Sequence, residues 1–178
     1  MIQMYKYTDK EIDVLLKSMV ILVDTREQVN QHLTQYWDSK KFPYIVKKLD
    51  FADYTCMIPS NPELGIIKDL YFNDIVSVER KNSLEEISSC FTTTRTAFEG
   101  EFIRSKGNVH LLIEKASYED VINHNYKTEY KPVSFLASLH SFSDRYNIPI
   151  TYMKDNKYSG YFIYMTFKYA VRNYLLNK

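Results

Sequence analysis

A chain of 178 residues has the length of one ordinary domain, and its hydrophobic fraction of 45% and aromatic fraction of 15% exclude a disordered polypeptide. The formal net charge of +1 excludes a protein that attracts nucleic acid through its overall charge, so any such contact must come from a local basic face. We expect one domain over residues 1–178, with its core at about 19–153 and a helical C-terminal segment at 154–178.

The sequence fits neither a membrane protein nor a zinc or disulfide scaffold. The longest apolar run, residues 19–23, is far shorter than the roughly 20 residues of a membrane span. The N-terminus lacks the basic-then-apolar order of a signal peptide. The two cysteines and four histidines show no metal-ligand spacing. We expect a cytoplasmic protein with reduced, structural cysteines and no transmembrane segment.

The first half of the chain alternates helical and extended patterns. Thr8 and Glu11 form a capping box, and apolar residues at helical spacing follow them, which predicts a helix over residues 9–18. The apolar run 20–23 predicts a buried strand that ends at Asp24. A helix is expected at 32–41, and strands at 44–49, 54–58 and 75–80. The last two strands are expected to pair as a β-hairpin with a long loop.

The second half continues the alternation. Helices are expected at 83–91 and 94–106, a strand at 110–114, a short helix near Tyr118, a helix at 133–146, a strand at 148–153 and a closing helix at about 158–176. Interleaved strands and helices favour an α/β domain in which a central mixed sheet lies between helices.

Three charged residues, Glu79, Arg80 and Lys81, end the strand expected at 75–80. Side chains of a strand alternate between faces, so Glu79 and Lys81 share one face while Arg80 points to the other. If Asp53 begins the paired strand, its carboxylate reaches the Glu79 face and completes a pair of oxygen ligands suited to Mg²⁺ or Mn²⁺. Phosphodiester hydrolysis uses such a site, because the metal polarises the phosphate and activates water while a lysine positions that water.

A lone Glu-x-Lys triplet is more often a solvated, charged turn than a catalytic motif. In this chain, however, Asp24 closes one apolar strand, Asp53 opens another and Glu79 closes a third. Three acidic strand ends in one small α/β chain predict a common metal pocket.

Three motifs, at residues 22–27 (LVDTRE), 53–54 (DY) and 78–81 (VERK), together resemble the nuclease domain of the XPF family, a branch of the PD-(D/E)xK nucleases. The resemblance extends over about residues 20–153. It implies a restriction-endonuclease-like, three-layer α/β/α fold and a Mg²⁺- or Mn²⁺-dependent DNA endonuclease. By this resemblance the functional residues are the acidic metal-site residues Asp24, Asp53 and Glu79, the catalytic Lys81, and the motif arginines Arg26 and Arg80.

Three features depart from the family pattern. Ala52 stands where the family has glycine, a mild change unless the backbone there needs a positive φ, which would cost roughly 1 kcal/mol. Glu85 stands where the family has aspartate. An insertion at 59–73 stands where the family has a short turn. It is either a loop that faces the substrate or a segment without a functional role.

Two glutamates have alternative roles. Glu85 belongs either to the site or to a helix cap with Asn82, and Ser83 with Glu86 forms a similar capping pattern. Glu27 either ligates a metal or caps the helix that follows it.

Arginines supply the expected contacts with DNA phosphates. Arg26, beside Asp24, is suited to a bidentate phosphate contact, whereas Arg80 is expected to brace the site through an ion pair on the opposite face. Arg95 is a candidate substrate-binding residue, although its spacing to Glu99 also suits an i,i+4 surface pair.

The closing helix carries apolar residues around more than one face, so it is expected to be wholly buried or shared with a partner. Because the XPF family often dimerises through its nuclease domains, the resemblance implies a homodimer as a hypothesis.

The sequence predicts an enzyme that hydrolyses DNA phosphodiester bonds by direct attack of a metal-activated water. The resemblance favours branched, flap or fork DNA, encountered in repair, recombination or replication. Two alternatives stay open: a catalytically silent nuclease fold that binds DNA or protein, and a nuclease of the same fold that acts on linear or four-way DNA.

Overall fold

The structure, a computed structural model, describes residues 6–105 and 108–177. The strands of this part of the chain are β1 (Val20–Val23), β2 (Tyr44–Val46), β3 (Tyr54–Ile58), β4 (Leu70–Tyr71), β5 (Ser77–Lys81), β6 (Val109–Glu114) and β7 (Ile150–Met153). They form one mixed sheet in the order β2-β1-β3-β5-β6-β7, and β4 pairs with β3 beside this path. β3 is antiparallel to both β1 and β5, whereas β5, β6 and β7 are parallel.

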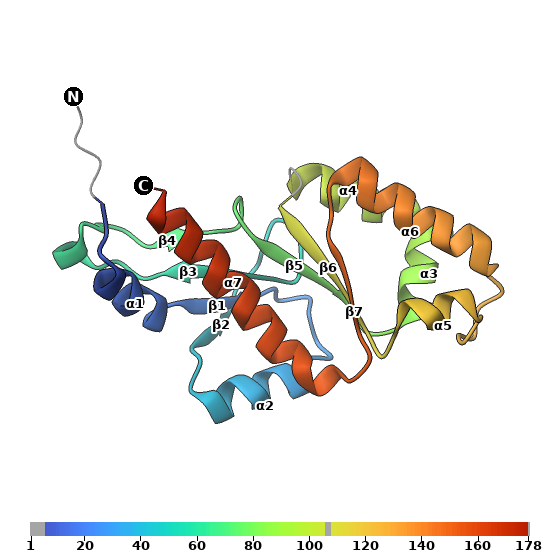
Figure 1. Ribbon diagram of the computed structural model, residues 1–178, viewed down its shortest axis with the longest axis horizontal. Helices are drawn as coiled ribbons and strands as arrows, with labels where there is room; N and C mark the ends of the chain where they lie inside the picture. Colours follow the sequence, from blue (N-terminus) through green and yellow to red (C-terminus); the bar gives the residue numbers. More distant parts are fainter. Residues whose placement is uncertain (1–5, 106–107, 178) are drawn as a thin grey trace.

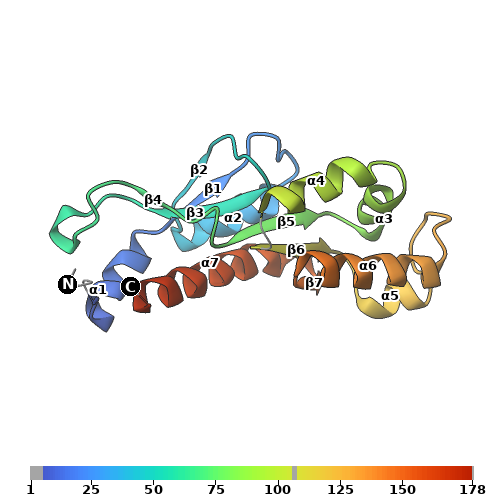
Figure 2. The same ribbon diagram turned by 90° about the horizontal axis from the view of Figure 1, so that it is seen from above.

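Helices cover both faces of this sheet. They are α1 (Asp9–Lys17), α2 (Gln31–Lys40), α3 (Leu84–Thr92), α4 (Arg95–Ser105), α5 (Tyr118–Ile122), α6 (Pro132–Tyr146) and α7 (Ser159–Leu176), with short 3₁₀ turns η1 (Pro62–Leu64) and η2 (Asn156–Tyr158). In Figure 1, α7 runs beside α1 and α2, and Figure 2 shows α3 and α4 on the other side of the sheet. The expected α/β architecture, with a mixed sheet between helices, is confirmed.

The core is divided into two clusters by the sheet. One cluster packs α1, α2 and α7 against inward side chains of β1 and β3, with Trp37 and Phe167 among its fully buried members. The other packs α3, α4, α5 and α6 against β6, with Phe98 and Phe142 stacked at 5.0 Å between ring centroids. No helix within the described residues is long and apolar enough to cross a bilayer.

Several boundaries differ from the sequence-based prediction. β2 ends at Val46 instead of residue 49, because the chain then leaves the sheet to run toward Asp53. β7 begins at Ile150 rather than 148. The insertion at 59–73 contains β4, which extends the sheet. The expected helix at 94–106 is α4, and Lys106 lies outside the described residues.

The closing helix α7 is neither wholly buried nor apolar on every side. A stripe that includes Ile163, Phe167 and Val171 is fully buried, whereas Tyr161 and Tyr169 on another face are about half exposed. The protein's own core therefore accounts for the apolar stripe, and the homodimer stays a prediction.

Arg80 of β5 is the centre of a network that joins four segments, namely β5, β6, the loop after β1 and α2. Its Nη1 donates to Glu114 Oε2 at the end of β6, and its Nη2 donates to both Glu27 Oε1 and the carbonyl of Val29, all at 2.8 Å. Glu114 is fully buried, and its second oxygen lies 2.8 Å from His32 Nε2 on α2. This network fixes β5 against β6, the loop after β1, and α2.

Ala52 has the backbone conformation that the family's glycine would adopt without strain. Its φ is 58°, in the left-handed region, and its side chain is buried. A side chain in this region costs roughly 1 kcal/mol. The conformation places Asp53 directly before β3, where the Asp53 N–H donates to the Val78 carbonyl.

We expect Ala52→Gly to raise the free energy of unfolding by roughly 1 kcal/mol, because the strain at φ 58° disappears. The matched control is Ala97→Gly on the exposed part of α4, which should lower it by roughly 0.5–1 kcal/mol. Urea unfolding monitored by circular dichroism measures both changes. A loss of stability in both variants would contradict the strain at position 52.

We expect Arg80→Met to cost about 3–5 kcal/mol, because it leaves the buried carboxylates of Glu27 and Glu114 without their cation. Arg95→Met is the control, since it removes an exposed pair with Glu99 that contributes less than about 1 kcal/mol. Glu114→Gln, which keeps a hydrogen-bond acceptor, should cost less than Arg80→Met. Equal midpoints for the Arg80 and Arg95 variants in urea would refute the proposed importance of the network.

Candidate active site

Asp53, Glu79 and Lys81 meet where β3 begins and β5 ends. Lys81 Nζ lies 2.6 Å from Glu79 Oε1, and the backbone N–H of Arg80 donates to Asp53 Oδ2 at 2.8 Å. The Lys81 ammonium also lies 5.2 Å from the ring centroid of Phe98 on α4. The strand alternation expected for β5 is present, because Glu79 and Lys81 share one face while the Arg80 side chain enters the network on the other.

Two adjoining hollows open onto these residues, and we call them together the site cleft. One, of about 260 Å³, is lined by Glu79 and by side chains of α4, and the other, of about 300 Å³, is lined by Glu27 and the end of β5. Both are lined by the same three charged residues, Arg26, Asp53 and Lys81. The cleft therefore exposes carboxylates and cations of the same site to a ligand.

The electrostatics of the site cleft favour a bound cation. Burial, followed by the negative charge of Glu79, raises the pKa of Asp53 well above its ordinary value. Burial also raises the pKa of Glu79, although Lys81 opposes this shift. Burial alone would lower the pKa of Lys81, but the two carboxylates raise it, so the ammonium stays charged. One ammonium faces two carboxylates, and a divalent cation bound beside them would stabilise their ionised forms.

Asp24 is fully buried, and its carboxylate already accepts three hydrogen bonds. Oδ1 accepts from the backbone N–H of Arg26 at 2.8 Å and from its Nε at 2.7 Å, and Oδ2 accepts from the Leu49 N–H at 2.7 Å. Burial opposes ionisation, but these hydrogen bonds lower the pKa of Asp24. Asp24 is not among the residues that line the site cleft. Its metal-ligand role stays a prediction, and its observed contacts orient Arg26.

Arg26 is the most accessible cation of the cleft. Its side chain is 59% exposed, and Asp24 accepts from Nε, while the two terminal nitrogens make no hydrogen bond among the described residues. An arginine fixed at one nitrogen and exposed at the others is suited to bind a phosphate.

Glu27 and Glu85, for which the sequence left two roles each, make defined contacts in the structure. Glu27 does not cap α2: its carboxylate pairs with Arg80, and the N-cap residue Asn30 makes no side-chain capping bond. Glu85 Oε1 accepts from the Lys127 N–H, so this side chain is directed to the loop before α6.

The helix that follows β5 is capped by the second of the two expected patterns. Ser83 is the N-cap residue of α3, and its hydroxyl accepts from the Glu86 N–H. The Glu86 carboxylate accepts in return from the Asn82 N–H at 2.8 Å. The alternative cap, Asn82 with Glu85, is therefore wrong.

Glu101 on α4 is a residue that the sequence reasoning missed. It lines the site cleft, and its charge raises the pKa of Glu79. Helical spacing carried the signal, because Ala97 and Phe98 line the same cleft four and three residues earlier. The sequence reasoning also missed Glu114, the buried partner of Arg80. Glu114 ends an apolar strand, and the pattern of that strand does not indicate which cation its carboxylate contacts.

Arg95, the expected substrate-binding residue, lies at the start of α4 and pairs with Glu99 at 3.1 Å. Arg145 approaches the same carboxylate at 3.6 Å. The i,i+4 surface pair is therefore present, and a DNA contact by Arg95 stays a prediction.

The donor set in the cleft fits a small, hard cation that keeps some of its water. Asp53 and Glu79 supply carboxylate oxygens from paired strands. No cluster of three or more His, Cys, Asp or Glu side chains that could hold an ion is found in residues 6–105 and 108–177. Two carboxylates nevertheless match Mg²⁺, which proteins commonly bind through one or two carboxylates with water and a substrate phosphate.

Comparisons with known proteins show a related fold. Two solved structures of XPF from Aeropyrum pernix, one of them in complex with DNA, superpose with TM-scores of 0.61 and 0.62 at 18% sequence identity. The matches cover 86% of this chain but only 65% and 66% of those chains, and at this identity they show the fold alone. No match was found among curated protein sequences.

A family model covers most of the sequence. The model of the ERCC4 domain matches residues 23–166, a span that contains Asp24, Asp53, Glu79 and Lys81 and every strand of the sheet after β1. By this match the chain belongs to the ERCC4 domain family, the family of XPF-type nucleases.

Proposed function

We propose that this protein is a Mg²⁺- or Mn²⁺-dependent endonuclease that hydrolyses phosphodiester bonds in branched, flap or fork DNA. The single observation that carries the proposal is the convergence of Asp53, Glu79 and Lys81 in an accessible cleft with Arg26 at its mouth. Membership of the ERCC4 domain family supports it, as does the archaeal XPF structure with DNA.

Asp53 and Glu79 would hold the cation, with further oxygens from water and the substrate phosphate. A bound divalent ion supplies Lewis-acid polarisation of the phosphate and lowers the pKa of water. Asp24 is a further ligand in this proposal only if its bonds to Arg26 and Leu49 open, so we assign it first to holding Arg26 in place. Glu27 and Glu101 both lie on the cleft wall; the charge of Glu27 raises the pKa of Asp53 and of Glu79, and the charge of Glu101 raises that of Glu79.

Two cationic side chains, Arg26 and Lys81, contact the phosphate or the attacking water in this proposal. Arg26 binds a nonbridging oxygen and Lys81 donates a hydrogen bond to the attacking water or to the phosphate. Arg80 does not touch the substrate, because its guanidinium is buried in the network with Glu114, and it acts by positioning β5. The reaction is direct hydrolysis: the water oxygen bonds to phosphorus, the ester P–O bond breaks, and the leaving oxygen takes up a proton.

Cleavage assays with variants of the site test this proposal. With Mg²⁺ or Mn²⁺ and labelled DNA, we expect Lys81→Met and Asp53→Asn to lower the cleavage rate by about 10²–10³-fold, since each removes an electrostatic contact to the reacting groups. Lys40→Met on the exposed end of α2 is the control and should cleave at the wild-type rate. EDTA should abolish cleavage.

The substrate panel contains linear, flap, fork and four-way DNA. Preference for flap or fork DNA supports the proposed substrate class, and preference for another member corrects it. Specific DNA binding without cleavage under any metal condition would identify a silent binding module instead. Cleavage that persists in EDTA or in both site variants rules out the proposed mechanism.

Metal binding should also change stability in a pH-dependent way. The pKa values of Asp53 and Glu79 are raised in the folded protein, so their contribution to stability is present below the ordinary carboxyl pKa of about 4 and is lost as pH rises through the raised values. A cation requires both carboxylates ionised, so its stabilising effect grows over the same interval. We expect saturating Mn²⁺ to raise Tm more at about pH 8 than at about pH 6.

Asp53→Asn should raise Tm of the metal-free protein and remove most of the Mn²⁺-dependent shift, because the amide keeps the acceptor for Arg80 N–H but carries no charge. Asp13→Asn on the exposed side of α1 is the matched control and should change neither quantity. Thermal unfolding by scanning fluorimetry measures both. A Mn²⁺ shift that survives Asp53→Asn would disprove the assignment of this ligand.

A further inference from the structure

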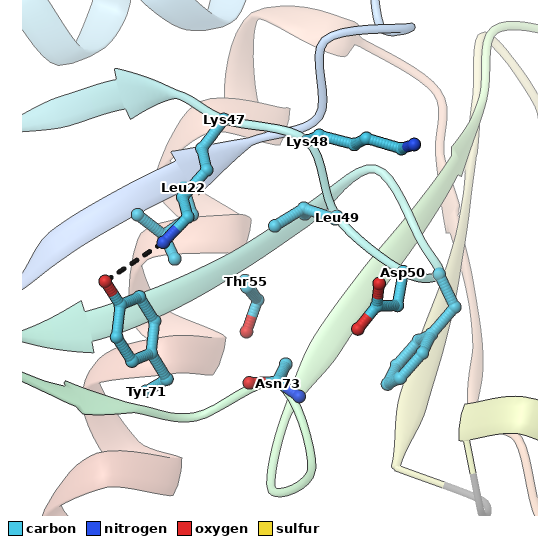
Figure 3. A pocket seen from close by; sticks show the side chains of 9 residues that line it. Leu22, Lys47, Lys48, Leu49, Asp50, Thr55, Tyr71 and Asn73 are labelled. Carbon is cyan, nitrogen blue, oxygen red and sulfur yellow. Dashed lines mark hydrogen bonds between the residues drawn. The ribbon is translucent and has the colours of Figure 1, made fainter.

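A second pocket, of about 170 Å³, lies on the sheet face opposite α1, α2 and α7. Leu22 of β1 and Thr55 of β3 form its base, and they alternate along their strands with Ile21 and Cys56, which belong to the core cluster of those helices. Tyr71 of β4 forms one wall, as Figure 3 shows. The opposite side is the segment after β2, residues 47–51, which leads directly to Asp53.

The pocket combines apolar surface with polar groups that have no partner. Leu22 and Leu49 are buried and present their side chains to it. The Asp50 carboxylate and the Asn73 amide oxygen, both at its other side in Figure 3, have no hydrogen-bond or ion-pair partner among the residues that the structure describes. One wall is aromatic, since the Tyr71 side chain lines the cavity.

Positive charge lies at the same place. Lys47 Nζ is 4.3 Å from the Tyr71 ring centroid and donates to the Tyr71 hydroxyl at 3.0 Å. Lys48 also lines the pocket, and its ammonium has no ion pair within the described part of the chain. Two lysines suit a phosphate backbone, whereas the adjacent Asp50 carboxylate would repel a phosphate placed inside the pocket.

The aromatic wall and the Asp50 carboxylate suit a flat, neutral ring inside the pocket, and the two lysines suit an anionic backbone attached to that ring. We propose that the pocket receives one nucleobase of the DNA strand that enters the site cleft. The base would stack on Tyr71, and its exocyclic amino group would donate to Asp50, as carboxylates accept from cytosine N4. The volume equals that of about six molecules of liquid water at ~30 Å³ each, enough for a single base.

The geometry connects this pocket to the proposed chemistry. Asp50 and Asp53 are three residues apart, so their Cα atoms are separated by at most about 11 Å. The Leu49 N–H also donates to Asp24, which holds Arg26. The inference rests on the proposed function, which identifies the ligand as DNA. The insertion at 59–73 supplies Tyr71 and Asn73, so its role would be to hold an unpaired base.

The test compares DNA strands with and without bases. Binding of a fluorescent single-stranded oligodeoxycytidine, and of the same backbone made only of abasic sites, is measured by anisotropy in EDTA. The wild-type protein should bind the strand with bases at least about fivefold more tightly, the lower range of a base–aromatic stack. Tyr71→Ala should bring this ratio close to one. Because both strands carry the same phosphates, loss of a Lys47 contact would leave the ratio unchanged.

Two further variants locate the contact. Tyr169→Ala on α7 removes a tyrosine of similar exposure, 52% against 42% for Tyr71, and should keep the wild-type ratio. Asp50→Ala should lower the preference for oligodeoxycytidine over oligothymidine, because thymine lacks the exocyclic amino group. Circular dichroism verifies that each variant is folded.

The outcomes separate this inference from the proposed function. A Tyr71-dependent ratio without any cleavage of branched DNA supports the base pocket and removes the nuclease assignment. Cleavage with equal affinity for both strands removes the base pocket alone. A ratio that survives Tyr71→Ala, or failure of the wild type to bind either strand, overturns the inference.

Discussion

The buried guanidinium of Arg80 is the interaction on which the rest of the site depends. Its two terminal nitrogens satisfy Glu114, Glu27 and the Val29 carbonyl on the core side of β5. Because side chains alternate along a strand, the same placement directs Glu79 and Lys81 to the opposite side, into the cleft. A shift of β5 by one residue would bury Lys81 among the carboxylates of the network and remove Arg80 from them. The ion pairs thus define the register that assembles the site.

The site cleft itself is less favourable to the folded state than the network beneath it. Glu79 is buried beside the half-buried Asp53, and one ammonium, Lys81, cannot neutralise both carboxylates. Ala52 adds backbone strain immediately before Asp53. Such local costs are typical of functional sites, where the surrounding structure holds groups that would separate in a less constrained protein. Arg80 and the paired strands β3 and β5 provide that constraint.

Much of the fold could be predicted from sequence periodicity, and the reasons for the exceptions are physical. The capping box at Thr8, the apolar run of β1 and the alternation of β5 each specify a local structure, and each is found. The strand after Pro43 is shorter than expected because residues 47–51 form a pocket wall, which a short extended sequence does not reveal. β4 is only two residues long and lies in a segment rich in turn-forming residues, so its pairing depends on β3 and not on its own sequence.

The site was predictable to the extent that strand geometry determines it. Alternation along β5 and the pairing with β3 are enough to bring Glu79, Lys81 and Asp53 together. The contacts of Glu101 and Glu114 depend on how α4 and β6 pack, which no local pattern encodes. Asp24 lies at a strand end, a position that is typical of a metal ligand. Its carboxylate instead accepts from two N–H groups of Arg26 and from the Leu49 N–H, and these contacts depend on how the loop after β1 and the segment after β2 fold.

The two-residue strand β4 has a consequence for how this chain tolerates change. β3 is paired with β5 only at Tyr54, and its far end is paired with β4 at Met57 and Ile58. Deletion of the insertion would remove β4, so the peptide groups at the far end of β3 would lose their hydrogen-bond partners on one side, beside buried hydrophobic residues. Unpaired sheet borders of this kind recruit strands from other molecules, so a shortened chain would be prone to self-association before any loss of catalytic groups.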